Sequence, residues 1–569
     1  MDEGRILYDS FDARFKAPFG CIKENERCVI GIEYPVSCGV NRLYLRLERE
    51  DGFAMTVPLQ VVSGAERAGY QRRECAFSLY EPGLYFYFFE FDTAASRFSL
   101  YRLGNHDTNL EEGERWQISC IPADYEPPES FYGRVLYQIF PDRFARLGEC
   151  DLSEKLTPFT LHACADEPPR RGPDENGLWN NDFYGGNFRG IESRLDYIAS
   201  LGVGTIYLNP IFKAYSNHRY DTADYMKPDP MLGTVDDFAS LCKSAAERGI
   251  RIILDGVFSH VGENSVYFDR YGVFGGGAVS DPCSRYRDWF KFRHYPDDYD
   301  CWWDVRSLPC VDEMNDGFLD LVIRSEDSVV AHWMRLGAAG FRLDVADELP
   351  DGFIALLRRR VRQLNPEGIV IGEVWEDASN KRSYGELRRY FTGGELDGVM
   401  NYPFRESILG FVCGELTPEN FVAKVERIYE NYPFEALLCC MTLLSTHDTP
   451  RVLTALREKL GDRALAAEKT AIALQHFLPG MPCIYYGDEA GMEGGGDPDN
   501  RRFFAECEHA AELFAQHLAM CALRREHEAL RRGRLSLRAD GGAVEITRTL
   551  GGDAVTLRAE GAIWEVSHN

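Results

Sequence analysis

The chain has 569 residues, and its 63 Lys and Arg against 90 Asp and Glu give a formal net charge of −27. So acidic a surface repels phosphate backbones, which argues against nucleic acid as a partner. Hydrophobic residues make up 45% and aromatic residues 13% of the chain, a balance that excludes a disordered protein. The aromatic side chains supply either a large core or a stacking surface for flat, neutral ligands such as sugar rings.

The N-terminus is acidic, and no apolar stretch of the roughly 18–20 residues that a membrane helix needs occurs in the chain. We therefore expect neither a secretory signal nor a membrane partner. The 17 cysteines are scattered and include no Cys-x-x-Cys pair. This use of cysteine favours a reduced, cytoplasmic protein.

Residues 1–125 are expected to form an N-terminal β-sandwich. Leu43, Leu45 and Leu47 recur at every second position, the pattern of a half-buried strand. The turn signal Glu81-Pro82-Gly83 interrupts the region. The polar stretch 121–130 then reads as a linker to the next domain.

From Val135 onward, short apolar runs alternate with helix-length amphipathic segments such as 236–246 and 353–364. This alternation favours a parallel sheet, because parallel strands need crossover helices. Eight such units suit a (β/α)8 TIM barrel, which we assign to residues 126–520. The predicted strands are Val135–Phe140, Thr205–Leu208, Ile252–Leu254, Gly340–Leu343, Ile369–Ile371, Gly398–Met400, Met441–Leu444 and Cys483–Tyr485.

Two segments depart from a plain barrel. The interval after the third predicted strand, from Asp255 to Phe341, is far longer than the roughly 30–45 residues of one unit. We therefore expect an inserted domain at about 261–330. The tail from about Leu523 is expected to be strand-like, so residues 521–569 are assigned to a small C-terminal β-domain.

Ionisable residues directly follow four of the predicted strands. Active sites of such barrels lie at the C-terminal ends of the strands, and side chains two apart on a strand point to the same side. We therefore expect these groups to meet at one rim. They are Asp255 and His260 after strand 3, Arg342 and Asp344 at strand 4, Glu373 after strand 5, and His447 and Asp448 after strand 7.

Carboxylates that converge in one cleft raise one another's pKa unless a cation offsets them. Arg342 is placed to keep Asp344 ionised, and we expect the crowding to raise the pKa of Glu373. One ionised carboxylate and one protonated acid, about 5–5.5 Å apart, are the groups that retaining glycoside hydrolysis uses. A divalent metal is the alternative, but a guanidinium two residues from Asp344 would repel it.

Four segments resemble the ordered sequence regions of the α-amylase family of glycoside hydrolases. The resemblance spans about residues 130–510. Three further segments, 135–144, 216–225 and 494–502, are similar to the branch of neopullulanases, cyclomaltodextrinases and maltogenic amylases, in which an N-terminal β-sandwich precedes the barrel. The four family segments are Asp255–His260, Gly340–Ala346, Gly372–Trp375 and Ser445–Asp448.

The resemblance implies a role for each matched residue. Asp344 would be the nucleophile that forms a β-glycosyl-enzyme. Glu373 would protonate the leaving oxygen and then activate water, and Asp448 would bind the 2- and 3-hydroxyls of the sugar at the cleavage site. The implied substrate-binding residues are Tyr220, Asp221, His260, Arg342, Trp375, His447, Asp497 and Arg501.

Three positions depart from the family pattern. Ser259 stands where many α-amylases have an Asn that ligates a structural calcium. We assign no metal ligand and expect no required cofactor, while the calcium question stays open. Asp347 and Glu376 replace an Asn and a His frequent in this branch. Both positions lie on the leaving-group side by resemblance, and we expect them to alter linkage or acceptor preference.

Together these observations predict a retaining enzyme that cuts α-1,4-glucosidic bonds in maltooligosaccharides, cyclodextrins, pullulan or starch, with α-1,6 cleavage left open. An α-glucan transferase or isomerising enzyme of the same family is the nearest alternative. A non-catalytic glucan-binding protein is less favoured, because such proteins typically lose one of the three carboxylates. The expected partners are an α-glucan and a second copy of the chain, bound through an N-terminal domain that could instead bind glucan.

Overall fold

The computed structural model describes residues 5–63, 67–110 and 112–568. The chain forms two compact units. The sandwich unit comprises residues 1–126, 376–395 and 419–437, and the barrel unit comprises residues 127–375, 396–418 and 438–569. Within the described residues, no helix combines the length and the apolar character needed to cross a membrane.

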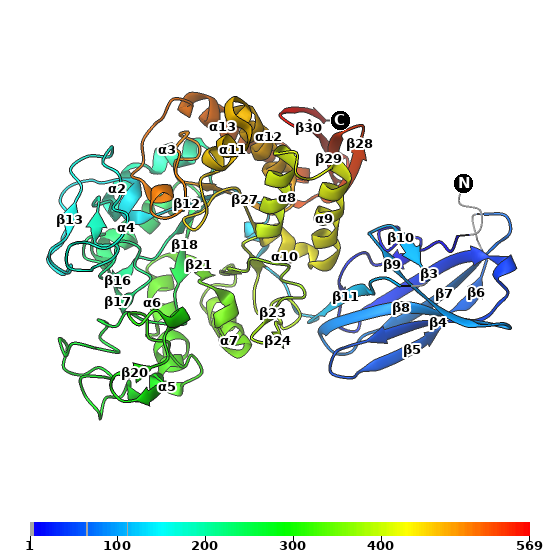
Figure 1. Ribbon diagram of the computed structural model, residues 1–569, viewed down its shortest axis with the longest axis horizontal. Helices are drawn as coiled ribbons and strands as arrows, with labels where there is room; N and C mark the ends of the chain where they lie inside the picture. The colour runs from blue at the N-terminus through cyan, green and yellow to red at the C-terminus, as the bar shows by residue number, and fades with distance from the viewer. Residues whose placement is uncertain (1–4, 64–66, 111, 569) are drawn as a thin grey trace. The chain divides into compact units, whose positions relative to one another are not determined.

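The sandwich unit contains two sheets that share one core (Figure 1). Leu43, Leu45 and Leu47 are buried in this core together with aromatic residues of β8, as their alternation predicts. One sheet has the order β1-β3-β7-β6. The other has the order β10-β9-β8-β11-β2, with β4 pairing with both β8 and β5. The strands are β1 Lys16–Ala17, β2 Ile22–Lys23, β3 Arg27–Pro35, β4 Val40–Glu48, β5 Ala54–Pro58, β6 Gln60–Val62, β7 Tyr70–Ser78, β8 Gly83–Thr93, β9 Arg97–Leu103, β10 Asp107–Asn109 and β11 Trp116–Ile121.

The segments 376–395 and 419–437 group with these sheets, although the sequence analysis did not separate them from the barrel. The first carries β23 (Arg382–Ser383) and β24 (Glu386–Leu387), and the second carries most of α9 (Pro418–Asn431). Arg102 of β9 pairs with Glu430 of α9 at 2.8 Å, and both side chains are buried. A buried charge needs such a partner, so this pair ties α9 to the sandwich.

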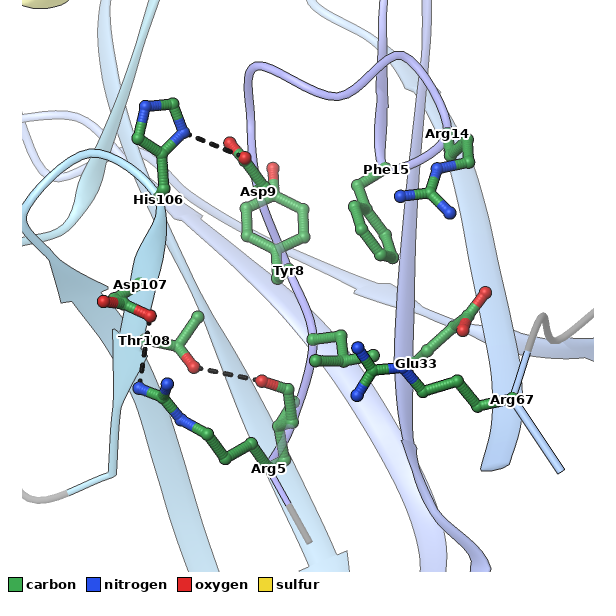
Figure 2. A pocket seen from close by; sticks show the side chains of 12 residues that line it. Arg5, Tyr8, Asp9, Arg14, Phe15, Glu33, Arg67, His106, Asp107 and Thr108 are labelled. Atoms are coloured by element: carbon green, nitrogen blue, oxygen red, sulfur yellow. Dashed lines mark hydrogen bonds and ion pairs between the residues drawn. The ribbon is translucent and has the colours of Figure 1, made fainter. Parts of the chain in front are cut away.

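A pocket in the sandwich unit lies between the N-terminal segment and β10 (Figure 2). Arg5 pairs with Asp107 at 3.1 Å, and Thr108 donates to the carbonyl oxygen of Ile6 at 3.2 Å. His106 bridges the carboxylates of Asp9 and Glu426 at 2.9 and 3.0 Å. These contacts hold the N-terminal segment on the sheet.

The barrel unit is built on eight parallel strands in the order β25-β22-β21-β18-β15-β12-β27-β26. A parallel bridge between Met400 and Met441 joins the two ends of this order, so the sheet closes into a barrel. Every predicted strand coincides with one of the eight. They are β12 Leu136–Ile139, β15 Thr205–Leu208, β18 Arg251–Gly256, β21 Ala338–Leu343, β22 Ile369–Gly372, β25 Gly398–Val399, β26 Met441–Leu443 and β27 Met481–Tyr485.

The helices of this unit start where the sequence favours it. Thr234 and Asp237 form a reciprocal capping box at the start of α4. Along α7, Phe353, Leu357 and Val361 are buried at helical spacing, as the amphipathic pattern predicts. The longer helices include α2 Phe188–Ser193, α3 Leu195–Ser200, α4 Val235–Ala246, α6 Val329–Arg335, α7 Asp351–Leu364, α8 Tyr402–Val412, α10 Phe434–Cys439 (shared with the sandwich unit), α11 Val452–Leu460, α12 Ala464–Phe477 and α13 Ala510–Glu526.

The predicted excursion between β18 and β21 contains only short elements before α6 resumes the barrel pattern (Figure 1). They are η3 Arg287–Trp289, β19 Phe292–His294, β20 Asp298–Tyr299, η4 Trp302–Asp304, α5 Asp316–Leu319 and η5 Asp320–Arg324. A second long connection, from β12 to β15, carries β13 (Thr160–Leu161) and β14 (Asp182–Phe183) and was not singled out from the sequence.

The expectation of strand from Leu523 onward is wrong for its first ten residues. These residues complete α13 and form α14 (Glu528–Arg532), because Ala, Leu, Arg and Glu favour helix. Four antiparallel strands then follow in chain order. They are β28 Arg534–Asp540, β29 Ala543–Leu550, β30 Asp553–Glu560 and β31 Ile563–His568.

Candidate active site

The predicted ionisable residues stand at the C-terminal ends of neighbouring strands. Asp255 on β18 lies opposite Arg342 on β21, and Leu343 lies opposite Gly372 on β22. This parallel register aligns the strand ends. It therefore brings Asp344 and Glu373, the residues that directly follow β21 and β22, to the same rim.

Arg342 is the centre of this cluster. Its guanidinium nitrogen NH1 lies 2.8 Å from Asp255 Oδ1 and 3.0 Å from Asp344 Oδ1. The other terminal nitrogen, NH2, lies 2.7 Å from Glu373 Oε2. The Arg342 side chain has no exposed surface, so one buried cation holds three carboxylates. Asp344 and Glu373 consequently face one cleft.

Burial dominates the electrostatics of this cluster. It raises the pKa of Asp344 well above its usual range, and the negative charges of Glu373 and Asp255 add to the effect. Burial also raises the pKa of Glu373, the direction that we expected from crowding. Arg342 lowers the pKa of both carboxyls, but less than burial raises it. Arg342 thus favours the ionised form of Asp344, as we expected, but burial outweighs it, so the net pKa shift is upward.

Glu373 is held by further donors. The backbone amide of Val345 donates to Oε2 at 2.9 Å, and the indole Nε1 of Trp375 donates to Oε1 at 3.2 Å. The Trp375 ring stacks on Tyr402 at 3.9 Å between centroids, with the planes 9° apart. Trp375 nevertheless keeps 42% of its surface exposed, so an oriented aromatic face lies beside the acid.

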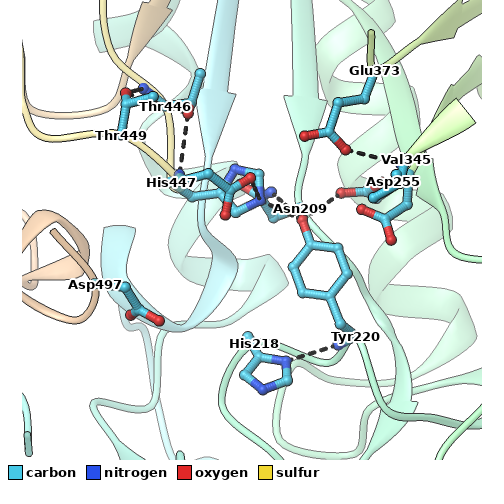
Figure 3. A network of polar contacts seen from close by, with 12 residues as sticks. Asn209, His218, Tyr220, Asp255, Val345, Glu373, Thr446, His447, Thr449 and Asp497 are labelled. Atoms are coloured by element: carbon cyan, nitrogen blue, oxygen red, sulfur yellow. Dashed lines mark hydrogen bonds and ion pairs between the residues drawn. The ribbon is translucent and has the colours of Figure 1, made fainter. Parts of the chain in front are cut away.

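Tyr220 connects Asp255, which pairs with Arg342, to His447 after β26 (Figure 3). Its hydroxyl lies 2.5 Å from His447 Nε2 and donates to Asp255 Oδ2 at 3.0 Å. Because the amide nitrogen of Gln138 donates to His447 Nδ1 at 2.9 Å, the ring proton of His447 is on Nε2. Burial, followed by the charge of Arg501, lowers the pKa of His447 well below its usual value. His447 is therefore a neutral hydrogen-bond donor.

Asp448 differs from the other two predicted catalytic carboxylates in its exposure. Its side chain is 32% exposed, against 9% for Asp344 and 4% for Glu373. His447 Nε2 lies 3.0 Å from Asp448 Oδ2, and Arg501 NH2 lies 3.2 Å from Oδ1. Arg501 also pairs with Asp497 at 3.1 Å. Asp448 is thus oriented and still open to an incoming ligand.

The polar groups of Asp221 and His260 form hydrogen bonds with the protein backbone. The carboxylate of Asp221 accepts backbone hydrogen bonds from Tyr215 and Ser216 at 3.1 and 3.2 Å. His260 Nε2 lies 3.1 Å from the carbonyl oxygen of Tyr220, and burial lowers the pKa of His260 to about 4. Both side chains support the turn that carries Tyr220, and a direct substrate contact by either one stays a prediction.

Ser259 is the position that the family resemblance relates to a calcium site. Ser259 Oγ lies 3.0 Å from Nδ1 of His260, so the hydroxyl is already engaged. A calcium here would lack the amide ligand of the family, and these residues do not fit that site. Across the described part of the chain, no three His, Cys, Asp or Glu side chains form a group that could hold a metal ion.

The sequence analysis missed several polar residues of the site. Tyr207 on β15 donates to Asp255 Oδ2 at 2.7 Å, and Asn209 Nδ2 donates to the Tyr220 hydroxyl at 3.1 Å. Gln138 on β12 reaches both Asn209 and His447. A glutamine inside the apolar run Leu136–Ile139 was a usable signal, because a buried amide needs hydrogen-bond partners.

Comparison with known proteins gives three findings. Residues 138–512 match the family model described as alpha amylase, catalytic domain. An amylopullulanase of Thermoanaerobacter thermohydrosulfuricus is 31% identical over 93% of this chain and 39% of its own length. Neopullulanase 2 of Thermoactinomyces vulgaris is 36% identical over 72% of this chain and 65% of its own.

The fold has a matching neighbour as well. A solved cyclomaltodextrinase superposes with a TM-score of 0.68 at 27% identity, covering 97% of this chain and 91% of that one. The curated relatives are longer, and the chain spans about two fifths of the amylopullulanase.

Proposed function

Because the chain belongs to the α-amylase family, we propose that it is a retaining glycosidase that cleaves α-1,4-glucosidic bonds in maltooligosaccharides, cyclodextrins or pullulan. Some α-1,6 cleavage is part of the proposal, since amylopullulanase and neopullulanase are among its relatives. The observation that carries the proposal is the pairing of Asp344 and Glu373 with the single guanidinium of Arg342.

The geometry supports a two-step displacement. Asp344 attacks the anomeric carbon while Glu373 protonates the leaving oxygen, and Glu373 then removes a proton from the water that hydrolyses the glycosyl-enzyme. The pKa of Glu373, raised by burial, suits an acid that must hold a proton near neutral pH. Asp344 must be ionised for this attack, so its proton leaves to solvent before the sugar binds. As the attack begins, Arg342 stabilises the carboxylate form of Asp344.

Asp448 and Tyr220 are placed to hold the sugar. The exposed oxygens of Asp448 can accept hydrogen bonds from two neighbouring sugar hydroxyls, and such bonds strengthen as the ring flattens. The Tyr220 ring is parallel to His447 within 8°, which fixes its plane as a stacking surface.

The test is a product profile on pullulan, β-cyclodextrin and starch, with Asp344→Asn as the matched inactive control. Panose from pullulan indicates α-1,4 cleavage, and maltotriose indicates α-1,6 cleavage. Retention of the anomeric configuration, followed by NMR, supports the double displacement. Full activity of Asp344→Asn, or inversion, would refute it.

Three accompanying proposals have their own tests. We propose that catalysis needs no metal or cofactor, because carboxylates and Arg342 supply all the groups of the displacement; EDTA should leave kcat/KM unchanged. We propose a cytoplasmic location, since all 17 cysteines are free. Cell fractionation tests this location.

We propose that the sandwich unit binds glucan or a second copy of the chain. Affinity electrophoresis detects the first of these, and analytical ultracentrifugation detects the second.

A further inference from the structure

Two tryptophans of the excursion between β18 and β21 form an exposed stack. The rings of Trp302 and Trp303 lie 4.3 Å apart with planes 12° apart. Trp303 keeps 64% of its surface exposed. The fold thus leaves most of this indole uncovered while Trp302 backs it.

The protein holds Trp303 in place at a conformational cost. Its φ of 46° is left-handed, a conformation that is strained for a bulky residue. Two backbone hydrogen bonds close the loop. The amide of Trp302 donates to the carbonyl oxygen of Leu308 at 2.9 Å, and the amide of Val305 donates to the carbonyl oxygen of Trp302 at 2.8 Å. The indole Nε1 of Trp303 donates to Glu348 Oε1 at 3.0 Å. The ring is therefore oriented before any ligand arrives.

This construction repeats that of Trp375 in the site. Each indole is exposed on one side, stacks on a second aromatic ring, and donates its N–H to a glutamate: Trp375 to Glu373, and Trp303 to Glu348. A flat apolar face with fixed orientation suits the apolar face of a sugar ring.

The contacts of the loop join it to the segment that follows β18 and carries His260. The Trp302 ring lies 5.4 Å from the ring of His260. The amide of Val261 donates to the carbonyl oxygen of Pro309 at 3.1 Å, so the strand that follows the loop pairs with the segment containing His260. The stacked pair Trp302 and Trp303 is thus joined to the segment that carries His260.

Its position also indicates which part of the substrate it meets. Glu373 protonates the leaving oxygen, so the departing sugars lie on its side of the cut bond. Val345, whose amide holds Glu373, directly precedes the short helix η6 (Ala346–Glu348) that ends at Glu348. Glu348, which orients Trp303, thus stands three residues along the chain from the amide that holds Glu373.

We propose that Trp303, backed by Trp302 and oriented by Glu348, stacks on a glucose ring of the leaving or acceptor part of the α-glucan. This inference rests on the proposed function. Trp303 thereby favours substrates that extend past the cut bond and retains acceptor sugars for transfer. Glu348 is a positioning residue that acts through the indole.

The test compares maltohexaose with α-maltosyl fluoride, whose leaving group carries no sugar. Trp303→Ala should lower kcat/KM for maltohexaose about five- to tenfold, mainly through KM, and leave α-maltosyl fluoride within about twofold. The yield of transfer products from maltotriose should fall as well. Tyr271→Ala, a residue 65% exposed in the same excursion, should change neither substrate.

Glu348 supplies a second measurement. Glu348→Ala should raise KM for maltohexaose in part, and Glu348→Gln should restore it, because the amide oxygen still accepts the indole N–H. Equal losses on both substrates, or no loss on maltohexaose, would overturn the inference and leave the proposed function intact. A wild-type protein inactive on both substrates would instead refute the proposed function.

Discussion

Replacement of Arg342 by glutamine gives the sharpest test of the site's electrostatics. The substitution leaves Asp255, Asp344 and Glu373 buried without their cation. Removing one partner of a buried ion pair costs about 3–5 kcal/mol of unfolding free energy. We expect a loss of that size at pH 8, together with loss of activity.

The loss should depend on pH in a defined direction. Without Arg342, the folded-state pKa values of these carboxyls rise further above those of the unfolded chain, which lie near pH 4. A carboxyl with a raised folded pKa stabilises the fold below its unfolded pKa, and this stabilisation is lost as pH rises through the folded pKa. As the pH falls, each extra proton that the folded variant holds therefore restores about 1.4 kcal/mol of unfolding free energy per pH unit. The destabilisation caused by Arg342→Gln should be smaller at pH 5 than at pH 8.

Urea unfolding at pH 8, 7, 6 and 5, followed by tryptophan fluorescence, measures this slope. Every tryptophan except Trp116 belongs to the barrel unit, so the signal reports the unit that holds the site. Arg451→Gln is the matched control, because Arg451 is equally buried but pairs with one carboxylate, Asp488, at 2.9 Å. A loss of stability at Arg342 that is constant across this range, or no steeper than at Arg451, would refute the reasoning.

Three further predictions concern the site and the barrel that carries it. Glu373→Gln should lower kcat on maltotriose about 10²–10⁴-fold, because the leaving oxygen loses its proton donor. The fluoride of α-maltosyl fluoride needs no proton to leave. The burst rate of the first step on this substrate, measured by stopped flow, should therefore stay near the wild-type value. Tyr220→Phe removes the hydroxyl that donates to Asp255, and should lower kcat/KM about tenfold while a ligand-binding titration shows stacking retained. Gly340→Ala should destabilise the barrel by about 3 kcal/mol or more in urea, since a Cβ there would lie 2.0 Å from the carbonyl oxygen of Ile369; a wild-type midpoint would contradict it.

The fold follows from the sequence wherever one pattern repeats. Strands such as Thr205–Leu208 and Ile369–Gly372 are short apolar runs, and their alternation with amphipathic helices leaves few topologies open. The tail was predicted less well. Arg531-Arg532-Gly533 is a helix-stop signal at the end of α14, but the alternation seen from Val544 onward was extended back over the helical residues around Leu523. The grouping of 376–395 and 419–437 with the sandwich depends on long-range contacts that no local pattern encodes.

The sequence predicts which residues form the site more readily than it predicts their protonation states. Strand periodicity and motif order single out Arg342, Asp344 and Glu373, but whether burial or Arg342 decides their pKa values depends on how completely the barrel excludes water. In the same way, the sequence marks Asp221 as polar and near Tyr220. Only the fold shows that its carboxylate is occupied by the turn of its own loop.

The backbone after Asp344 shows why the carboxylates act as a pair. Val345 has a φ of 33°, a left-handed conformation that a β-branched residue adopts at a cost of about 1–3 kcal/mol. In this conformation the Val345 amide donates to Glu373 Oε2, and the next amide, of Ala346, donates to the Glu373 carbonyl oxygen at 3.1 Å. The segment that follows Asp344 is therefore joined to Glu373 by two backbone amides, and Arg342 bridges the two carboxyls as a third link. Because these links converge on Glu373, we expect a change at Val345 to alter the geometry of both carboxyls rather than of one.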